Sequence, residues 1–597
     1  MRDVFDVVVV GSGAGGGVIA GELAQRGRDV LLLEAGPHLT AADFVRWEAK
    51  ATHDLFWPLR LAPLPNGEML AFLAGRCVGG TTTINTKVAL RAHERDVAKW
   101  QDASGLTNDG GEPFTASDLA PYYDRVEQVL GVRVRTDWTT SVHTVEAGPH
   151  LTAADFVRWE AKATHDLFWP LRLAPLPNGE MLAFLAGRCV GGTTTINTKV
   201  ALRAHERDVA KWQDASGLTN DGGEPFTASD LAPYYDRVEQ VLGVRERTDW
   251  TTSVHTVEAG FHALGAELEP VHSYTDGNCM RCGSCLQGCP TNAGKSTENT
   301  YIHDAWARGL LELRADANVE RVLVEDSQAT GVEYVDVDGA RHTARAGAVV
   351  VACGALNTPQ LLLRSGLRGE AIGKYLGLHP VRLVYGLFEE PQDAHMVYPI
   401  TAHSMAHQHD EDGGFVIEAT TIQDPISFAT TLCDENGPLR GERLVEAVRG
   451  FRHWVGLLAM ANDENNATVV VDENGGERFD IDFQPSELER INASFEFSRK
   501  VLEASGAKQI CWTGLASTHV QGSCRMGDDS GRSVVDRNGE SHEVKRLFVG
   551  DGSLVPRTLS VNPSLTIMAL ATRLADHLDS DPNRYLGSKA AGVGTTA

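Results

Sequence analysis

The N-terminal part of the chain alternates between apolar runs and stretches of small residues. Val7 to Val10 form an apolar run, and residues 11–16 then read Gly-Ser-Gly-Ala-Gly-Gly. A small-residue segment continues to Arg26, and a second apolar run ends at Glu34. This order of strand, GxGxxG loop, helix, strand and acid predicts a Rossmann βαβ unit that binds a dinucleotide.

The residues of this unit have distinct physical roles. Gly11 permits the tight turn, Gly13 lets the backbone approach a pyrophosphate, and Gly16 allows close contact between helix and strand. Glu34 follows Gly11 by 23 residues and is placed to accept hydrogen bonds from both ribose hydroxyls. The next two residues, alanine and glycine, offer no cation for a 2′-phosphate, which disfavours NADP. The pattern alone does not separate FAD from NAD.

Later parts of the chain predict more strands of two kinds. Residues 348–354 and 547–552 each read as a buried strand that ends in glycine. Residues 381–388 and 467–472 alternate instead and are separated by turns rich in Asp, Gly, Asn and Pro. We therefore expect an α/β fold, with a doubly wound domain assembled from discontinuous stretches and a second domain that carries an antiparallel sheet.

One stretch of the sequence occurs twice. Residues 34–145 recur as residues 146–257, each 112 residues long, and differ only at Val134 and Glu246. Structural repeat arrays have periods of about 20–50 residues and diverge between units. Two near-identical blocks indicate instead a recent tandem duplication or an assembly error. Removal of either copy leaves a chain of 485 residues, which is 597 minus 112.

A single domain has room for one copy, so we expect the other to be extruded. Copy one joins natively to Leu33, copy two joins natively to the segment beginning at Glu258, and loop-closure entropy is nearly equal for excluding either block. We favour copy one slightly, because residues 34–85 then follow the second strand without interruption. The extruded copy carries two tryptophans and a phenylalanine suited to burial, which predicts aggregation.

Composition narrows the possible functions. With 597 residues, 42% of them hydrophobic, the chain exceeds one core and predicts at least two domains. A formal net charge of -26 opposes binding to nucleic acid, to anionic membranes and to anionic substrates. No apolar stretch reaches the roughly 18 residues of a membrane helix, and the N-terminus lacks a signal-peptide pattern. We expect a cytoplasmic protein with a small, uncharged substrate.

Two further glycine-rich stretches carry a family resemblance. Residues 75–85 read Gly-Arg-Cys-Val-Gly-Gly-Thr-Thr-Thr-Ile-Asn and return as residues 187–197, whereas residues 354–362 read Gly-Ala-Leu-Asn-Thr-Pro-Gln-Leu-Leu. Their unhindered amides and hydroxyls suit the phosphates and ribityl chain of a cofactor. They resemble the two signatures of glucose-methanol-choline (GMC) flavoenzymes, apart from Arg368, which stands where the second signature ends in glycine. The resemblance extends from Asp6 to about His577, with one duplicate set aside.

The resemblance implies a reaction. GMC enzymes oxidise an alcohol to an aldehyde or ketone by hydride transfer to flavin N5, and O2 or a redox acceptor then takes the electrons. The main alternative is an NAD-dependent dehydrogenase, which would leave the later flavin motifs unexplained. A further alternative is an inactive electron-carrying or misassembled product in which the extra copy blocks FAD.

The resemblance also implies how FAD is held. Asp551 lies near the ribityl chain and Val319 contacts the adenine through its backbone. Ile84 stands where some members bind flavin covalently through histidine, which implies non-covalent FAD. The implied cofactor set is Gly11, Gly13, Gly16, Glu34, Gly79, Gly80, Thr81, Asn85, Val319, Gly354, Asp551, Gly552 and Pro563, with the copy-two equivalents Glu146, Gly191, Gly192, Thr193 and Asn197.

Two C-terminal residues are candidates for catalysis. His519, in Thr-His-Val-Gln-Gly-Ser-Cys-Arg-Met-Gly, resembles the family histidine that faces the flavin, and neutral histidine suits removal of a hydroxyl proton. Asn562, in Ser-Val-Asn-Pro-Ser, matches a position occupied by His or Asn among relatives. Its amide cannot take up the proton but donates to a developing alkoxide.

A cysteine cluster has the spacing of an iron–sulfur motif. Cys279, Cys282, Cys285 and Cys289, followed by proline, match the bacterial ferredoxin run. In that arrangement the fourth cysteine ligates a second cluster, and no second run exists in this chain. A similar loop in alcohol- and sterol-oxidising GMC proteins need not hold iron. We favour structural cysteines over an iron–sulfur cluster, and a cluster over zinc.

A histidine-rich segment is the other candidate metal site. His403, His407 and His409 precede Asp410, Glu411 and Asp412. We interpret this segment as a solvated polar loop in preference to a metal site.

These inferences divide the chain into a Rossmann-like FAD-binding domain and an α+β substrate domain. The predicted segments are 1–145 (N-terminal FAD-binding segment), 146–257 (duplicate), 258–368 (cysteine-rich loop and second signature), 369–507 (substrate domain), 508–585 (C-terminal catalytic segment) and 586–597 (disordered tail).

Overall fold

The computed structural model describes residues 4–11, 14–33, 46–47, 60–63, 69–72, 107, 115, 157–159, 172–176, 180–289, 291–336, 338–396, 399–420, 425–472 and 476–585. The chain divides into two units, Met1–Ala49 with Ala154–Ala597 and Lys50–Ala153. In the second unit, β4 (Arg60–Pro63) and β5 (Met69–Phe72) form an antiparallel pair. Among the described helices, none has both the length and the apolar composition that crossing a bilayer requires.

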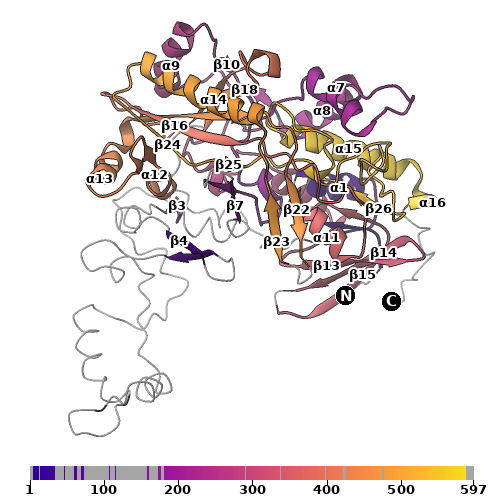
Figure 1. Ribbon diagram of the computed structural model, residues 1–597. Coiled ribbons are helices and arrows are strands. Elements are labelled where there is room, and N and C mark those ends of the chain that lie inside the picture. Colours follow the sequence, from indigo (N-terminus) through magenta and orange to yellow (C-terminus); the bar gives the residue numbers. More distant parts are fainter. Residues whose placement is uncertain are drawn as a thin grey trace. The chain divides into compact units, whose positions relative to one another are not determined.

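The first sheet of the larger unit contains the predicted Rossmann strands (Figure 1). Its order is β12-β2-β1-β15-β14-β13, and β26 pairs with β15. Neighbours among β12, β2, β1, β15 and β26 are parallel, whereas β13 and β14 extend the sheet in antiparallel fashion. The strands are β1 (Val4–Val10), β2 (Val30–Leu33), β12 (Leu311–Arg314), β13 (Asn318–Glu325), β14 (Gln328–Val335), β15 (Arg341–Val351) and β26 (Leu547–Val549).

Helices bury the centre of this sheet. Val7, Val8 and Val9 are fully buried, as expected for a central parallel strand whose apolar residues run without alternation. Helix α1 follows β1 and packs on α15, which in turn packs on α8. The helices of this domain are α1 (Ala14–Gln25), α7 (Glu206–Ser216), α8 (Ala228–Leu242), α10 (His303–Ala307), α11 (Thr358–Arg364), α15 (Ser564–Ser580) and α16 (Pro582–Tyr585).

The second sheet is largely antiparallel. Its order is β10-β17-β18-β21-β16-β24-β19-β20, with β25 beside β16 and the β7–β8 hairpin beside β25. The strands are β7 (Arg172–Pro175), β8 (Met181–Phe184), β10 (Glu269–Pro270), β16 (Val381–Leu387), β17 (Ile400–Ser404), β18 (Phe415–Thr420), β19 (Cys433–Asp434), β20 (Gly437–Pro438), β21 (Trp454–Ala461), β24 (Gln509–Trp512) and β25 (Ala516–Ser517). The predicted combination of a Rossmann-like domain and an α+β substrate domain is therefore confirmed.

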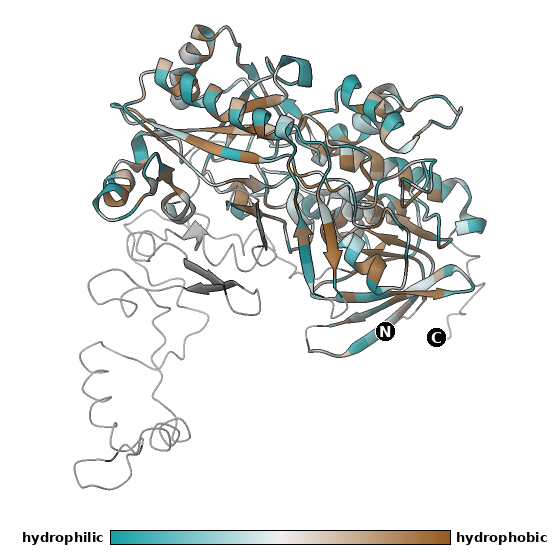
Figure 2. Ribbon diagram, in the orientation of Figure 1, coloured by the Kyte–Doolittle hydropathy of each residue, from teal (hydrophilic) through white to brown (hydrophobic). Residues whose placement is uncertain are grey.

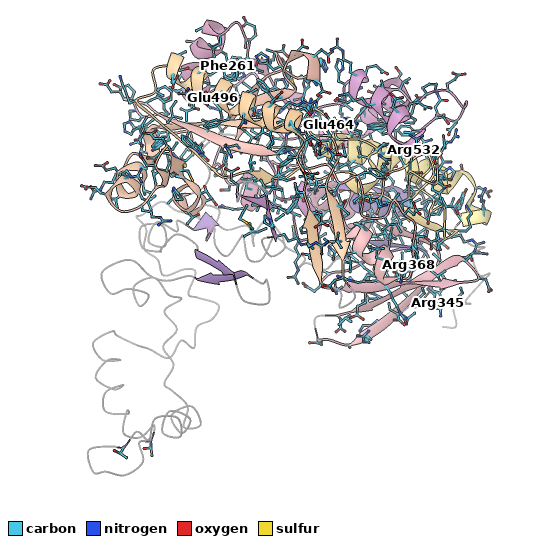
Figure 3. The ribbon with its side chains drawn as sticks, viewed as in Figure 1. Phe261, Arg345, Arg368, Glu464, Glu496 and Arg532 are labelled. Carbon is cyan, nitrogen blue, oxygen red and sulfur yellow. The ribbon has the colours of Figure 1, made fainter. Side chains whose placement is uncertain are left out.

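Helix α14 (Pro485–Ala504) covers one face of the second sheet together with α9 (Thr252–Ala263). Proline at its first position and a capping box between Gln484 and Glu487 begin the helix. Its turns alternate between hydrophilic and hydrophobic in Figure 2, and its apolar side chains lie against the strands. Phe261, labelled in Figure 3, places its ring 6.0 Å from that of Phe497 and joins the two helices.

Small elements complete the larger unit. They are β3 (Arg46–Trp47), β6 (Val157–Trp159), β9 (Arg245–Glu246), β11 (His272–Ser273), β22 (Thr468–Val471), β23 (Glu477–Asp480), α12 (Pro425–Thr431) and α13 (Glu442–Arg449).

The second copy of the repeated segment enters the fold. Trp212, Phe226 and Tyr235 of copy two are buried in the core of the first domain, whereas most of copy one lies outside the described residues. The slight preference for copy one is therefore wrong. The physical reason is local, because α9 runs without a break from copy two into the unique sequence that begins at Glu258. Helical hydrogen bonding across that junction is cooperative and is available to copy two alone.

The repeat provides a matched pair of deletions. Deletion of residues 34–145 or of residues 146–257 leaves the same 485-residue sequence, except that the position of Glu246 carries Glu in the first variant and Val in the second. Glu246 is exposed in β9, so we expect both variants to fold, to be more soluble than the full chain, and to differ in unfolding free energy by no more than about 1 kcal/mol. Urea denaturation and limited proteolysis measure this. Loss of the fold in both variants would mean that the extra copy is structurally required.

Candidate functional site

The carboxyl ends of four strands meet at one edge of the first sheet. Val10 pairs with Leu33 and with Val351, and Val351 pairs with Val549. The residues that follow these ends therefore gather at that edge, where open α/β sheets bind their ligands. Gly11, Gly354 and Asp551, all predicted to bind the cofactor, lie among them.

The turn from β1 into α1 is closely packed. A Cβ at Gly16 would lie 1.8 Å from the carbonyl oxygen of Gly11, and one at Gly15 would lie 1.5 Å from that of Gly550. Gly11 itself has a φ of 93°, a conformation that side chains disfavour. Glycine is therefore required at these positions. The requirement at Gly15 was missed by the GxGxxG pattern, which counts it as a variable position.

Asp551 joins this edge to the second signature. Its carboxylate accepts hydrogen bonds from the amide of Gly354 at 2.8 Å, the hydroxyl of Thr358 at 2.5 Å and the amide of Ser553 at 2.7 Å. Burial raises the pKa of Asp551, although hydrogen bonds from Ser553, Thr358 and Gly354 favour its charged form. Gly552, the next residue, begins the short helix η7 (Gly552–Leu554).

The first signature is supplied by copy two. Its helix η2 (Gly192–Thr194) contacts α1, and Gly191 before it has a φ of 85°. The side chain of Thr193 is half-buried and accepts from the amide of Gly187, and Asn197 donates to the Tyr274 hydroxyl at 2.6 Å. The copy-two loop therefore lies beside the helix that follows the dinucleotide-binding turn.

His519 and Asn562 lie next to each other. Asn562 Nδ2 is 3.5 Å from His519 Nε2, at the outer limit of a hydrogen bond. On the other side of the ring, His519 Nδ1 is 3.2 Å from Nδ1 of His379, a residue that the sequence analysis did not identify. His379 is fully buried, and its Nε2 has no hydrogen-bond partner among the described residues.

An antiparallel bridge accounts for the histidine pair. Gly377 and Gln521 exchange backbone hydrogen bonds of 2.8 and 3.0 Å, and in an antiparallel ladder this register places residue 379 opposite residue 519. Asp463 accepts from the amide of Leu378 at 2.6 Å and so helps to hold His379, whose φ is 45°. The backbone bridge between these two segments, which are far apart in the sequence, therefore brings His379 and His519 together.

A residue of copy two forms hydrogen bonds with the segment that carries Asn562. Asp208 of α7 is buried and accepts from both the amide and the hydroxyl of Ser560, at 3.1 and 2.6 Å. A second contact holds the same segment. Glu464, labelled in Figure 3, forms ion pairs with Arg490 of α14 at 2.7 Å and with Arg557, which precedes Asn562 in this segment. Asn562 is thereby held just before α15, whose N-cap is Pro563.

Burial keeps the ionisable groups around this pair uncharged. The ring of His519 is half-buried, and burial lowers the pKa of His519 to about 4. Burial lowers the pKa of His379 well below its usual range, aided by its proximity to His519. Glu418 of β18 is fully buried beside Asn562, and burial raises its pKa to about 8. At neutral pH the histidines are therefore neutral and Glu418 is predominantly protonated.

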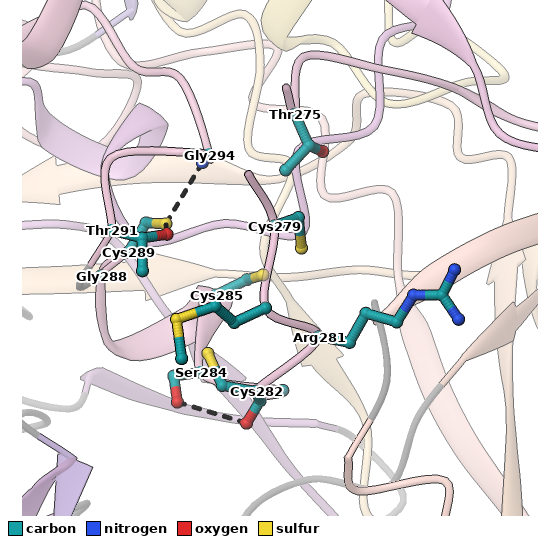
Figure 4. Close-up of a pocket in the computed structure, with 12 residues that line it drawn as sticks. Thr275, Cys279, Arg281, Cys282, Ser284, Cys285, Gly288, Cys289, Thr291 and Gly294 are labelled. Atoms are coloured by element: carbon teal, nitrogen blue, oxygen red, sulfur yellow. Dashed lines mark hydrogen bonds between the residues drawn. The ribbon is translucent and has the colours of Figure 1, made fainter. Parts of the chain in front are cut away.

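The four cysteines line one pocket (Figure 4). Cys285 is buried, and Cys289 Sγ accepts from the amide of Gly294 at 3.2 Å. Burial raises the pKa of the Cys285 thiol well above its usual range. Within the described part of the chain no three His, Cys, Asp or Glu side chains are arranged to hold a metal ion. The iron–sulfur alternative is therefore not supported.

The positions of the remaining residues predicted from the sequence are as follows in the described part of the chain. Val319 is buried at the start of β13. His403, assigned to a loop from sequence, lies instead in strand β17, so that prediction was wrong. Seven members of the implied cofactor set lie outside the described residues: Gly13, Glu34, Gly79, Gly80, Thr81, Asn85 and Glu146.

The chain matches known protein families and structures. Residues 5–151 and 140–381 match the N-terminal model of the GMC oxidoreductases, and residues 477–571 match the C-terminal model. The chain is 28% identical to a long-chain-alcohol oxidase, FAO4B, of Arabidopsis thaliana over 72% of this chain and 62% of that protein. It is 30% identical to an uncharacterized GMC-type oxidoreductase, y4nJ, of Sinorhizobium fredii, over 69% of this chain and 84% of that protein.

A third relative and a solved structure complete the comparison. Paromamine 6'-oxidase of Streptomyces fradiae is 29% identical over 64% of this chain and 76% of its own length. The structure of pyridoxine 4-oxidase from Mesorbium loti superposes with a TM-score of 0.60 at 17% identity, covering 96% of this chain and 99% of that one. This likeness shows the fold alone. The chain spans a little under two thirds of the length of the long-chain-alcohol oxidases.

The Asp551 contacts can be tested by substitution. Asp551→Asn replaces an acceptor oxygen by an NH2 group, which must face one of the three donors now bound to the carboxylate. We expect a loss of about 1–3 kcal/mol in unfolding free energy, measured by urea denaturation, because a buried donor loses its partner. Asp338→Asn at an exposed turn is the control. Equal stability of the two variants would show that the carboxylate does not hold the edge together.

Proposed function

Since the chain belongs to the GMC oxidoreductase family, we propose that it oxidises a small-molecule alcohol in an FAD-dependent reaction, with His519 and Asn562 at the reacting hydroxyl. The observation that carries this proposal is the position of His519 Nε2 beside Asn562 Nδ2. A proton acceptor and a hydrogen-bond donor next to each other are what removal of a hydroxyl proton requires.

The described residues fit FAD. Gly11, Gly15 and Gly16 allow the N-terminus of α1 to pack directly against the backbone at this sheet edge, and a pyrophosphate is favoured at a helix N-terminus. Gly354, Asp551 and the copy-two loop Gly191–Thr193 line the same edge or the adjoining face of α1 and would hold the rest of the cofactor. Bound there, FAD supplies the acceptor for the hydride of the alcohol. The finer assignments, including Val319 and Pro563, are part of this proposal.

His519 acts as the base through Nε2. For Nε2 to accept a proton, the neutral ring must carry its hydrogen on Nδ1, and that hydrogen is donated to Nδ1 of His379. His379 then carries its own hydrogen on Nε2. The contact orients the His519 ring and selects its tautomer. His379 is thus a positioning residue, and His519 receives the hydroxyl proton as the alcohol is oxidised.

Asn562 has a complementary role. Its Nδ2 group points toward His519 Nε2 and, with substrate bound, donates to the oxygen that loses its proton. Its Oδ1 has no partner among the described residues. The position just before α15 adds the favourable field of a helix N-terminus for developing negative charge.

The relatives differ in their substrates. Their names give long-chain alcohols, paromamine and pyridoxine. The proposal includes O2 or another redox partner as the electron acceptor.

Flavin content tests the cofactor. We expect the purified protein to show a flavin absorbance spectrum that substrate bleaches without air. A colourless protein that takes up no FAD on reconstitution, or one that reduces NAD, would reject the proposal in favour of a nicotinamide dehydrogenase or an inactive product.

Substitution of His519 tests the base. His519→Ala should retain flavin but reduce the rate of flavin reduction by about 10²–10⁴-fold, the usual contribution of a positioned acid–base group. Stopped-flow absorbance without air measures this. His303→Ala, which removes an exposed histidine of α10, is the matched control. Equal rates in the two variants would remove His519 from the mechanism.

The pH dependence follows from the pKa of His519. Because only the neutral ring accepts a proton, flavin reduction should be fully active above the His519 pKa of about 4 and should decline as pH falls through it. The rate is measured in buffers spanning that range, with protein integrity checked at each pH. A rate independent of pH there, in folded protein, would contradict this assignment.

A further inference from the structure

The pocket of four cysteines has no role in the proposed function. Cys279, Cys282, Cys285 and Cys289 line it as free thiols (Figure 4). Burial is the main cause of the raised pKa of Cys285, and each of the other three thiols contributes to it, Cys289 the most among them. The four sulfur atoms therefore lie near one another. Because the described residues form no metal site there, the chemistry open to this pocket is that of the thiols themselves.

Cys289 has the surroundings of a reactive thiol. It is partly exposed, and its Sγ accepts a hydrogen bond from the amide of Gly294 at 3.2 Å. Lys199 lies beside it, because a Cβ at Gly294 would lie 3.1 Å from Cε of Lys199 and 3.6 Å from Sγ of Cys289. Reactive cysteines in proteins are partly exposed and lie near a cation, whereas buried ones are inert. Cys289 meets both conditions, and the buried Cys285 does not meet the first.

Lys199 links this pocket to the first signature. Its side chain is fully buried, and its ammonium group donates to the backbone carbonyls of Thr194 and Thr195, the latter at 3.0 Å. Burial lowers the pKa of Lys199 to about 8, and the charges of Cys285 and Cys289 oppose this more than any other group does. A buried cation is normally paired with an anion, and here its strongest charged neighbours are thiols.

We propose that this pocket is a site of reversible oxidation, where hydrogen peroxide oxidises Cys289 and the product forms a disulfide with Cys285. Sγ of Cys289 attacks one oxygen of the peroxide, the O–O bond breaks, and one water leaves a sulfenic acid on Cys289. Sγ of Cys285 then attacks that sulfur, the S–O bond breaks, and a second water leaves. The two thiols thus lose two electrons and two protons, which the peroxide takes up.

The site is next to a loop that the proposed function uses. Lys199 binds carbonyls at the end of η2, which belongs to the loop proposed to hold FAD. With O2 as the electron acceptor, the oxidation of one alcohol forms one hydrogen peroxide, so the proposed function supplies the oxidant. The thiol chemistry does not depend on that supply, because added peroxide tests it directly.

Differential alkylation tests the proposal. The purified full-length chain is reduced, freed of reductant and treated with hydrogen peroxide, and mass spectrometry identifies the cysteines that are alkylated before and after dithiothreitol. We expect Cys285 and Cys289 to become protected together and to be recovered by dithiothreitol. Cys433, which is partly exposed but outside the pocket, is the internal reference, and Cys289 should be oxidised about 10-fold faster or more.

Three results would overturn the proposal. They are oxidation of Cys289 no faster than that of Cys433, a disulfide that joins Cys289 to a thiol other than Cys285, and iron with acid-labile sulfide in protein purified without air, because the thiols would then be ligands. None of these results bears on flavin reduction by an alcohol, so the proposed function is judged separately.

Serine variants separate the roles of the two thiols. Cys289→Ser removes the thiol that peroxide attacks, so Cys285 should remain reduced. Cys285→Ser removes the second thiol, so the sulfenic acid of Cys289 should persist and be trapped by dimedone. Cys433→Ser is the matched control and should form the disulfide at the wild-type rate. Oxidation of Cys285 in Cys289→Ser, or the absence of a dimedone adduct in Cys285→Ser, would overturn the assignment.

Removal of the buried cation gives an independent measurement. Lys199→Met keeps most of the length of the side chain without its charge and should slow the oxidation of Cys289 by about 10-fold. Lys508→Met, which removes an exposed lysine, should leave the rate unchanged. Urea denaturation checks the fold of both variants, and the serine variants decide the proposal if Lys199→Met does not fold. An unchanged rate in folded Lys199→Met would overturn the role of Lys199.

Discussion

The close approach of α1 to the ends of β15 and β26 is the constraint on which the site depends. A single Cβ at Gly15 would come within 1.5 Å of the carbonyl oxygen of Gly550. This contact brings the N-terminus of the helix to the sheet edge where Gly354 and Asp551 lie, so the helix field acts on that edge. Close packing alone therefore requires glycine at this position.

A second constraint connects the two domains. The backbone bridge between Gly377 and Gln521 joins the start of the antiparallel domain to the C-terminal segment and places His379 opposite His519. Burial then keeps both rings neutral, and a base must be neutral before it accepts a proton. The bridge fixes the position of the proposed base, and burial keeps its ring neutral.

The two copies of the repeated segment show which features depend on neighbouring residues and which depend on the rest of the fold. The β4–β5 and β7–β8 hairpins have the same sequence and the same register, with Arg60 opposite Phe72 and Arg172 opposite Phe184. In addition, β8 pairs with β25 and joins the second sheet. A hairpin forms from neighbouring residues alone. Its place in a larger sheet depends on which copy continues into the next element of the domain, here through α9.

Several features were predictable from the sequence by itself because each depends on short-range pattern. Consecutive apolar residues and glycines at fixed spacings identified the Rossmann unit and the second signature, and the segments around His519 and Asn562 had recognisable local sequences. The alternating segments also predicted the antiparallel sheet. These elements are encoded within stretches of a few residues to a few tens of residues.

Other features were decided only by tertiary structure. Ferredoxin-like spacing of four cysteines does not by itself bring their thiols into a metal site, because ligation depends on side-chain directions that spacing leaves open. Likewise, no local pattern marks His379, because its contact is with the ring of His519, which is 140 residues away in sequence. Strand register and burial create those environments, and both arise only when distant segments pack together.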